Sequence, residues 1–376
     1  DALDVLTYTW EQLDDGVVTR ANFGPENPSG ANFRSRKPTT SPERYFPELE
    51  RVLQGTLTQV NPAEGSPWET VSDVERDLNF AFTVRDNVVG GGQVSSETMS
   101  VRVVNAAGPF VVTSQATNVV YQSGSSQEIT WDVANTNIAP VNAQTVDIYL
   151  STDAGLTFST LLIEGVVNDG SQMVQIPSVA TATARIKVMA SDNVFYAINT
   201  ANFTVNNADV ELQFDELEYT VCQPAELVVP FVYKTNNGFI EESTFSVYGA
   251  PANLGVTFSS NTATINNTNL SITFSSTAAV AEGNYSMTIL STSQNNTTPV
   301  ILNLTINSAN YNDVTLVSPL DMSVEVQMGG PLFWEQNDNY TSYDVQIATD
   351  NAFANVVETA STLFTSYNPI NLQPET

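Results

Sequence analysis

Apolar and polar residues alternate in short runs along most of the chain, and clusters of Gly, Pro, Asn and Asp separate these runs. Alternation with a period of two predicts β-strands, because successive side chains of a strand point to opposite faces. Almost no stretch shows a sustained helical period. Short strands bounded by turn residues are typical of sandwich domains of about 100 residues. We therefore expect an all-β fold, a string of about four immunoglobulin-like or fibronectin type III-like β-sandwich domains.

The first predicted domain covers residues 1–107. Residues 6–10 alternate as a strand, and residues 78–85 and 99–104 have the pattern of closing strands. Between them lies an irregular insertion, about residues 22–70, that is rich in Pro, Arg and Asn. Within it, residues 41–55 carry prolines at helix-start positions and end in glycine, which predicts one short helix. We expect this sandwich to be incomplete at its N-terminal end.

Three further domains are predicted over residues 108–207, 208–308 and 309–376. The second has close to seven strand-like runs with Trp131 in an early one, as an immunoglobulin-like sandwich has. The third alternates in the same way. The last resembles the opening strands of a fibronectin type III domain, with Trp334 as its core tryptophan, but it is too short for the usual complement. We therefore expect it to be incomplete at its C-terminal end, and the chain to be a fragment of a longer protein.

The charge of the chain is strongly negative, with 41 acidic residues against 12 basic ones and a net charge of −29. From residue 103 onward, three basic residues stand against 25 acidic ones. Such a surface repels phosphate, and nucleic-acid affinity depends on cation contacts to phosphate, so we expect no nucleic-acid partner. No apolar run approaches the roughly 18 residues of a membrane span, and we expect none.

The chain has no histidine and a single cysteine, Cys222. Histidine is the usual general base near neutral pH and the commonest metal ligand, so serine and cysteine triads and histidine-based zinc sites are excluded. We therefore assign no catalytic residue and no zinc site to this chain. Cys222 lies in an alternating run and is predicted to be a buried strand residue.

Three stretches of the first domain carry a family resemblance: residues 6–14 (LTYTWEQLD), residues 33–35 with residues 44–47 (FRS and RYFP), and residues 78–87 (LNFAFTVRDN). They resemble the polycystic-kidney-disease-like (PKD-like) module of secreted flavobacterial zinc metalloproteases of the reprolysin-like type. Residues 129–133, 146–155 and 184–188 are similar to the module that follows in those proteins. The family's catalytic motif of two histidines flanking a glutamate has no counterpart here. The resemblance implies an accessory region, followed in the family by a signal for type IX secretion in Bacteroidetes.

Residues 151–158 (STDAGLTF) match the Asp-box pattern known from sialidases. Sialidases carry several such boxes and an arginine cluster, whereas this chain has one box and a single arginine after residue 102. We therefore interpret the segment as a structural hairpin turn and not as part of a glycan hydrolase. The residues of this predicted turn are Ser151, Asp153, Gly155, Thr157 and Phe158.

Calcium is the one candidate cofactor, because loop carboxylates are the hard oxygen ligands that this ion prefers. The alternative interpretation is that these acids are solvated, since no Asp-x-Asp-x-Asp-Gly loop is present. The predicted ligands are Asp14, Asp15, Asp73, Asp77 and Asp86. Weaker candidates are Asp192, Asp209, Asp215 and Asp350.

Two observations leave sugar chemistry open. Glu11 beside Trp10, or Glu335 beside Trp334, would suit acid catalysis next to a stacking aromatic ring, although each tryptophan lies in an alternating strand where core packing is expected. Aromatic residues predicted in exposed loops could bind carbohydrate by stacking, and these are Tyr45, Phe195, Tyr196 and Tyr340.

The sequence thus predicts a non-catalytic accessory region of a secreted or cell-surface bacterial zinc metalloprotease. It would act as a spacer and would contact a protein or polysaccharide surface. The alternative is a self-standing adhesive or fibre-forming extracellular protein, whose sandwiches exchange strands with neighbouring chains at open sheet edges. A glycoside hydrolase with paired carboxylates is the third hypothesis.

Overall fold

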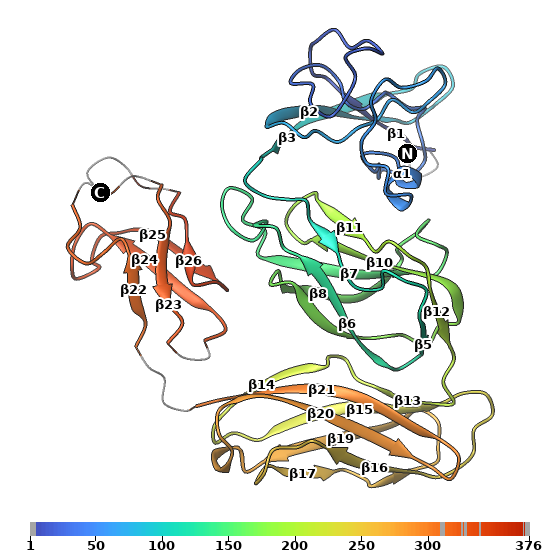
Figure 1. The fold of residues 1–376 in the computed structure, drawn as a ribbon, viewed down its shortest axis with the longest axis vertical. Coiled ribbons are helices and arrows are strands. Elements are labelled where there is room, and N and C mark those ends of the chain that lie inside the picture. The colour runs from blue at the N-terminus through green and yellow to red at the C-terminus, as the bar shows by residue number, and fades with distance from the viewer. Residues whose placement is uncertain are drawn as a thin grey trace.

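The computed structural model describes residues 5–308, 313–324, 326, 329–337, 340–370 and 372. The chain is all-β, a string of β-sheet domains, and each sheet lies within one of four successive segments (Figure 1). We call these segments the first module (residues 5–107), the second (108–207), the third (208–308) and the fourth (313–372). The predicted boundaries fall between the sheets, and their behaviour as linkers stays a prediction.

The first module contains one antiparallel sheet in the order β1 (Thr7–Gln12), β2 (Arg76–Arg85) and β3 (Val94–Val103). Phe33, Leu78 and Phe80 form its small core. Among the described residues no second sheet covers this core, where we expected a sandwich. The irregular segment between β1 and β2 covers it instead, because that segment supplies Phe33 and its edge-on neighbour Phe46.

A buried carboxylate fixes the irregular segment. Glu69 is fully buried and accepts hydrogen bonds from Arg36 Nε and Arg44, each at 2.9 Å, and from the backbone N–H of Glu48 at 2.5 Å. The single α-helix of the described residues, α1 (Leu49–Leu53), begins directly after Glu48. The predicted short helix is therefore confirmed, although it is shorter than residues 41–55, because residues 41–47 form bends and irregular backbone while Arg44 and Glu48 bind Glu69.

The second module is a two-sheet sandwich. One sheet has the order β5-β12-β10-β7-β8, with β11 paired to β10, and the other has the order β4-β6-β9. Trp131 on β6 is buried, and its indole N–H donates to the buried Asn168 at 2.8 Å. The strands are β4 (Val111–Val112), β5 (Val120–Gln122), β6 (Ser126–Asp132), β7 (Thr145–Ser151), β8 (Thr160–Val167), β9 (Ser171–Gln175), β10 (Thr181–Ala190), β11 (Tyr196–Ile198) and β12 (Phe203–Asn206).

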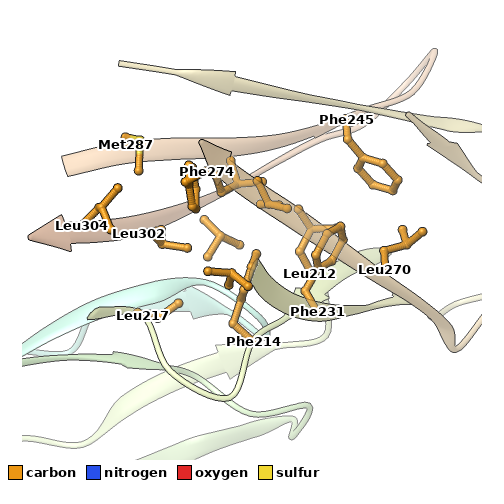
Figure 2. Packing of buried hydrophobic residues seen from close by; sticks show 14 of the residues in the cluster. Leu212, Phe214, Leu217, Phe231, Phe245, Leu270, Phe274, Met287, Leu302 and Leu304 are labelled. Carbon is orange, nitrogen blue, oxygen red and sulfur yellow. The ribbon is translucent and has the colours of Figure 1, made fainter. Parts of the chain in front are cut away.

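The third module is a larger sandwich with sheets β13-β15-β19-β17 and β14-β21-β20-β16-β18. Its core contains Phe214, Phe231 and Phe274, and Phe214 and Leu217 lie on the side of this core that faces the second module (Figure 2). The strands are β13 (Val210–Gln213), β14 (Glu218–Cys222), β15 (Leu227–Thr235), β16 (Ser243–Tyr248), β17 (Gly255–Phe258), β18 (Thr262–Ala263), β19 (Thr268–Ser275), β20 (Gly283–Thr292) and β21 (Thr297–Asn307).

The fourth module has two small sheets, β22-β23-β26 and β24-β25. Trp334 on β23 is buried against the Tyr343 ring, with ring centres 5.2 Å apart, so the predicted core tryptophan is confirmed. The strands are β22 (Thr315–Ser318), β23 (Leu332–Glu335), β24 (Tyr343–Ala348), β25 (Val356–Thr362) and β26 (Ser366–Tyr367).

The prediction for Cys222 was wrong. The residue does lie on a strand, but it is exposed at the end of β14. Val221 takes the inward position of that strand, and alternation therefore turns Cys222 outward.

Within the described part of the chain, no helix has the length and apolar character needed to cross a membrane.

Candidate functional site at the joints between modules

The predicted calcium ligands of the first module have separate surroundings. Asp14 accepts hydrogen bonds from the backbone and side-chain amides of Asn79, the latter at 2.7 Å. Asp77 forms an ion pair with Arg102 at 3.3 Å. Asp15 and Asp73 are exposed, and no side-chain contact of theirs is found among the described residues.

Asp86 lies far from the other acids. It follows β2, whereas Asp77 lies at the start of that strand, and nine residues at 3.3 Å each separate them by about 30 Å. Its carboxylate accepts the backbone N–H groups of Val88 and Gln93 and so closes the turn between β2 and β3. No group of three or more metal-binding side chains occurs in the described ranges. Calcium binding by these residues stays a prediction.

The weaker acidic candidates are also dispersed. Asp192 is exposed in a turn, Asp209 accepts from Asn237, and Asp350 accepts three backbone N–H groups of its own loop. Asp215 lines a cavity of about 160 Å³ between the second and third modules. The three hydrogen bonds hold the pKa of Asp350 below its ordinary value.

The residues of the predicted Asp-box form a hydrogen-bonded turn after β7. Ser151 Oγ donates to Asp153 at 2.6 Å and accepts the backbone N–H of Gly155 at 2.9 Å. Thr157 donates to Asp153 through its backbone N–H at 2.9 Å and its hydroxyl at 2.7 Å. Burial alone would raise the pKa of Asp153, but the bonds from Ser151 and Thr157 outweigh it and hold the pKa below its ordinary value.

This turn is the surface on which the first module rests. A Cβ atom added to Gly155, whose φ is +93°, would lie 2.4 Å from Cδ2 of Leu53 on α1. The helix of the first module therefore packs directly on the turn, and the positive φ of Gly155 favours glycine there. We call the contact between these two modules the first joint.

Lys187 on β10 occupies the centre of the first joint. Its ammonium group lies 4.8 Å from the ring centre of Tyr149, 5.0 Å from that of Phe158 and 5.8 Å from that of Tyr45. Tyr45 comes from the first module and the other two rings from the second. Burial lowers the pKa of Lys187, and the nearby Glu43 carboxylate partly offsets this effect. The negative faces of three rings thus hold one cation between two modules.

Three of the four aromatic residues predicted as carbohydrate platforms contribute to this joint or lie near it. The Tyr45 and Tyr196 rings meet edge to face at 5.3 Å, and Phe195 packs on Phe110 at 5.0 Å. All three side chains are therefore partly buried. The prediction that these loop aromatics are exposed was wrong, because Tyr45 and Tyr196 cover each other across the joint and Phe110 covers Phe195 within the second module. Tyr340 packs on Tyr343 in the fourth module.

A second joint, between the second and third modules, is built around Glu211. This residue lies on β13 and is only 1% exposed. Its carboxylate accepts hydrogen bonds from Ser123 Oγ at 2.5 Å, from Asn236 Nδ2 at 2.8 Å and from Ser178 Oγ. Three side chains from the two modules therefore satisfy the buried carboxylate; Ser123 is buried with it, whereas Asn236 is half-buried and Ser178 lies at the solvent-exposed edge.

The Gln175 side chain of the second module also binds backbone groups on both sides of the second joint. Gln175 Nε2 donates to the carbonyls of Gly124 and Leu212 at 2.7 and 2.6 Å, and Gln175 Oε1 accepts the N–H of Phe214 at 2.9 Å. Gly124 has a φ of +76°, and a Cβ atom there would lie 2.8 Å from Cγ of Glu211. As at the first joint, a glycine in the left-handed region permits close approach.

The connection between these modules is short, and two of its residues are hydrogen-bonded to the modules on either side. Three residues, 207–209, separate β12 from β13. The N–H of Ala208 donates to Ser123, its carbonyl accepts from Asn236, and the carbonyl of Asp209 accepts the N–H of Asn236. Such a connection leaves little freedom for bending, unlike a flexible polar linker.

The proposed acid and tryptophan pairs do not form sugar-binding sites. Glu11 and Trp10 are successive residues of β1, and Glu335 and Trp334 are successive residues of β23, so the members of each pair point to opposite faces. Trp334 is buried in its module, and the indole N–H of Trp10 donates to the carbonyl of Pro42 at 2.8 Å. Both tryptophans thus have packing roles.

No protein-family model matches the chain, and no curated protein matches it either. Among solved structures, it is similar to an S-layer protein SbsC fragment of domains 1–6, with 12% identity over 80% of this chain and 42% of that one, at a TM-score of 0.20. It is also similar to SbsC domains 4 and 5, with 14% identity over 45% of this chain and 80% of that one, at a TM-score of 0.20. An I-band fragment of titin shows 9% identity over 81% of this chain and 88% of that one, at a TM-score of 0.19. At these values the similarities carry no argument about function.

Proposed function

We propose that this chain is a non-catalytic accessory region of a secreted or surface-associated bacterial zinc metalloprotease, acting as a stiff spacer and as a contact for protein or polysaccharide surfaces. The observation that carries the spacer role is the pair of closed joints. Lys187 and Leu53 lie in the first, and Glu211 and Gln175 in the second. Modules connected in this way move as one body, because bending would separate the packed rings of the first joint and break the hydrogen bonds of the second.

The link to a protease comes from the resemblance of the first two modules to the accessory modules of that family. Two of the resembling stretches have structural roles here. Arg44, in the RYFP stretch, binds the buried Glu69, and Phe80, in the LNFAFTVRDN stretch, lies in the core. The chain itself carries no histidine, so peptide hydrolysis would belong to another part of the parent protein. Sequencing the coding region upstream tests this part, because the proposal requires a histidine-glutamate zinc motif there.

Pulsed electron paramagnetic resonance tests the spacer role. Spin labels are attached to cysteines introduced at exposed positions, in a Cys222→Ser background that removes the native thiol. The pair Val89→Cys and Leu161→Cys reports on the first joint. The pair Leu161→Cys and Ile265→Cys reports on the second. We expect one narrow distance distribution for each pair. Tyr45→Ala should broaden only the first distribution and Glu211→Ala only the second. Distributions that are already broad in the parent chain would refute the stiff spacer.

One observation favours the alternative of a fibre-forming adhesive protein. Strand β3 is exposed over residues 94–100, and within the described residues no strand pairs with its outer edge. Only Glu97 and Arg102 are charged along this strand, so it has little protection against pairing with another chain. Sedimentation velocity over a hundredfold range of protein concentration tests this alternative. Concentration-dependent oligomers that disappear with Val94→Lys would support it, and a monomer throughout would eliminate it.

A further inference from the structure

A cleft of about 370 Å³ opens beside the second joint. It lies where β5 of the second module, the connecting residues 207–209 and the start of β21 of the third module meet. The cleft falls in the range of about 300–1,000 Å³ that is usual for small-molecule sites, which often lie at the contact between domains. Its polar lining includes Tyr121, Gln122, Asn207, Asp209, Asn296 and Thr297.

The walls of this cleft are held in place by the joint itself. Ser123, which lines the cleft, donates to the buried Glu211 and accepts the N–H of Ala208. On the opposite wall, Thr298 Oγ1 donates to the carbonyl of Val210 at 3.2 Å. A ligand would therefore meet a cleft that needs no ordering of the two modules, which reduces the entropic cost of binding.

The lining offers hydrogen-bonding groups of both kinds. The side-chain amides of Gln122 and Asn207 and the hydroxyl of Thr297 are exposed to solvent, and an amide both donates and accepts. Asp209 keeps a second carboxylate oxygen beside the one that binds Asn237. Apolar surface from Val120 and Pro299 lies among these groups. This mixture suits the hydroxyls and C–H faces of a sugar ring.

The charge of the lining limits the ligand further. No lysine or arginine lines the cleft, and Asp209 is its one ionised residue. The basic residues after residue 103 lie outside the lining, and two of them are already engaged: Arg185 with Asn202, and Lys187 in the first joint. An anionic ligand would therefore meet an acidic surface without a cation to bind it.

From these observations we infer that the cleft between the second and third modules binds a neutral oligosaccharide. Gln122, Asn207 and Thr297 would bind its hydroxyls, and Val120 and Pro299 would pack against its ring carbons. This inference gives a ligand class to the contact part of the proposed function and rests on it. The spacer part is tested separately by the distance measurements.

Isothermal titration of the full chain tests the inference with cellohexaose, maltohexaose, mannohexaose and laminarihexaose as probes. We expect at least one of them to bind. The double variant Gln122→Ala with Asn207→Ala should weaken that binding by about tenfold or more, because it removes two amide partners. Gln93→Ala, which removes an equally exposed amide from the first module, should leave it unchanged.

Amide chemical shifts of the unmodified chain give a readout that does not depend on a variant. The binding oligosaccharide should shift the signals of Tyr121 and Thr297. The inference fails if none of the four probes binds at millimolar concentration, or if binding is equal in the double variant and leaves these signals in place. It also fails if an oligogalacturonate or a neutral peptide binds the cleft more tightly than every neutral sugar. The spacer role would still stand in that case if the spin-label measurements gave narrow distance distributions.

Discussion

Glu211 carries a buried carboxylate. Among the residues that the structure describes, no lysine or arginine pairs with it. Two hydroxyls and one amide satisfy it instead. An ionised group without a cation is costly to bury, and hydrogen bonds from three donors are what makes the burial tolerable. The second joint therefore depends on the match between these donors and one side chain.

Glu211→Ala should destabilise the chain by about 1–3 kcal/mol, because it leaves the buried Ser123 hydroxyl and the half-buried Asn236 amide without this acceptor. Glu211→Gln should cost much less, since its carbonyl oxygen can keep the bonds from Ser123 and Asn236 while the Ser178 hydroxyl rotates to accept from the new amide nitrogen. Chemical denaturation of both variants measures the difference. Equal losses for alanine and glutamine would show that the negative charge, and not the hydrogen bonding, stabilises the joint.

The tyrosines of the first joint make stability depend on pH. Burial raises the pKa of Tyr45, Tyr149 and Tyr196 above the ordinary value. Above about pH 10 the unfolded chain therefore loses phenol protons that the folded chain keeps, and the free energy of unfolding falls as pH rises. Lys187, with its lowered pKa, acts in the opposite direction, but one lysine opposes three tyrosines.

We expect the melting temperature to fall steadily between pH 10 and 12, with absorbance at 295 nm rising in the same step. The buried Tyr196 hydroxyl has no hydrogen-bond partner in the described structure, so Tyr196→Phe should be neutral or stabilising at pH 7 and should reduce the fall at high pH. Tyr248→Phe is the matched control, because Tyr248 is 75% exposed. An unchanged pH profile for Tyr196→Phe would contradict the argument.

At the scale of strands, alternation predicted the sandwiches but not their joints. On β10, Ala184, Ile186 and Val188 are the inward positions, and the same period predicts that Lys187 faces solvent. Lys187 does point away from the core of its own module, yet the first module covers it. Glu211, between Val210 and Leu212, is a second case. A period of two reports which face of a strand is inward and carries no information about another module on the outer face.

The first joint should open when Tyr45 loses its ring. Tyr45→Ala removes the contact with Tyr196 and one of the three rings around Lys187. We expect proteinase K to cleave the connection at residues 104–110 about tenfold faster, because cleavage follows the population of the opened form. Tyr248→Ala controls for the loss of a tyrosine at an exposed site. Equal cleavage rates in the variant, the control and the parent chain would show that Tyr45 does not hold the joint.

The whole molecule carries a net charge of −29, and joints that hold three modules together keep like charges close. Self-repulsion of this kind destabilises the compact state. Any divalent cation can relieve it by screening, whereas a specific calcium site would add a further stabilisation of about 2.7 kcal/mol at a hundredfold excess over Kd. The two effects can be separated with magnesium, which requires small octahedral geometry and does not fill a calcium site well.

The placement of the acids favours screening. Asp14 is bound to Asn79, Asp77 to Arg102, and Asp86 to its own turn about 30 Å from Asp77, so these carboxylates do not converge on one ion. We therefore expect millimolar calcium and magnesium to raise the melting temperature equally, and monovalent salt at higher concentration to reproduce the rise. A larger rise with calcium, abolished by replacing Asp14, Asp15, Asp73, Asp77 and Asp86 with asparagine, would instead establish the calcium site that the sequence predicts. It would also mean that loops of the first module rearrange when calcium binds, since the carboxylates of Asp14, Asp77 and Asp86 have separate partners in this structure.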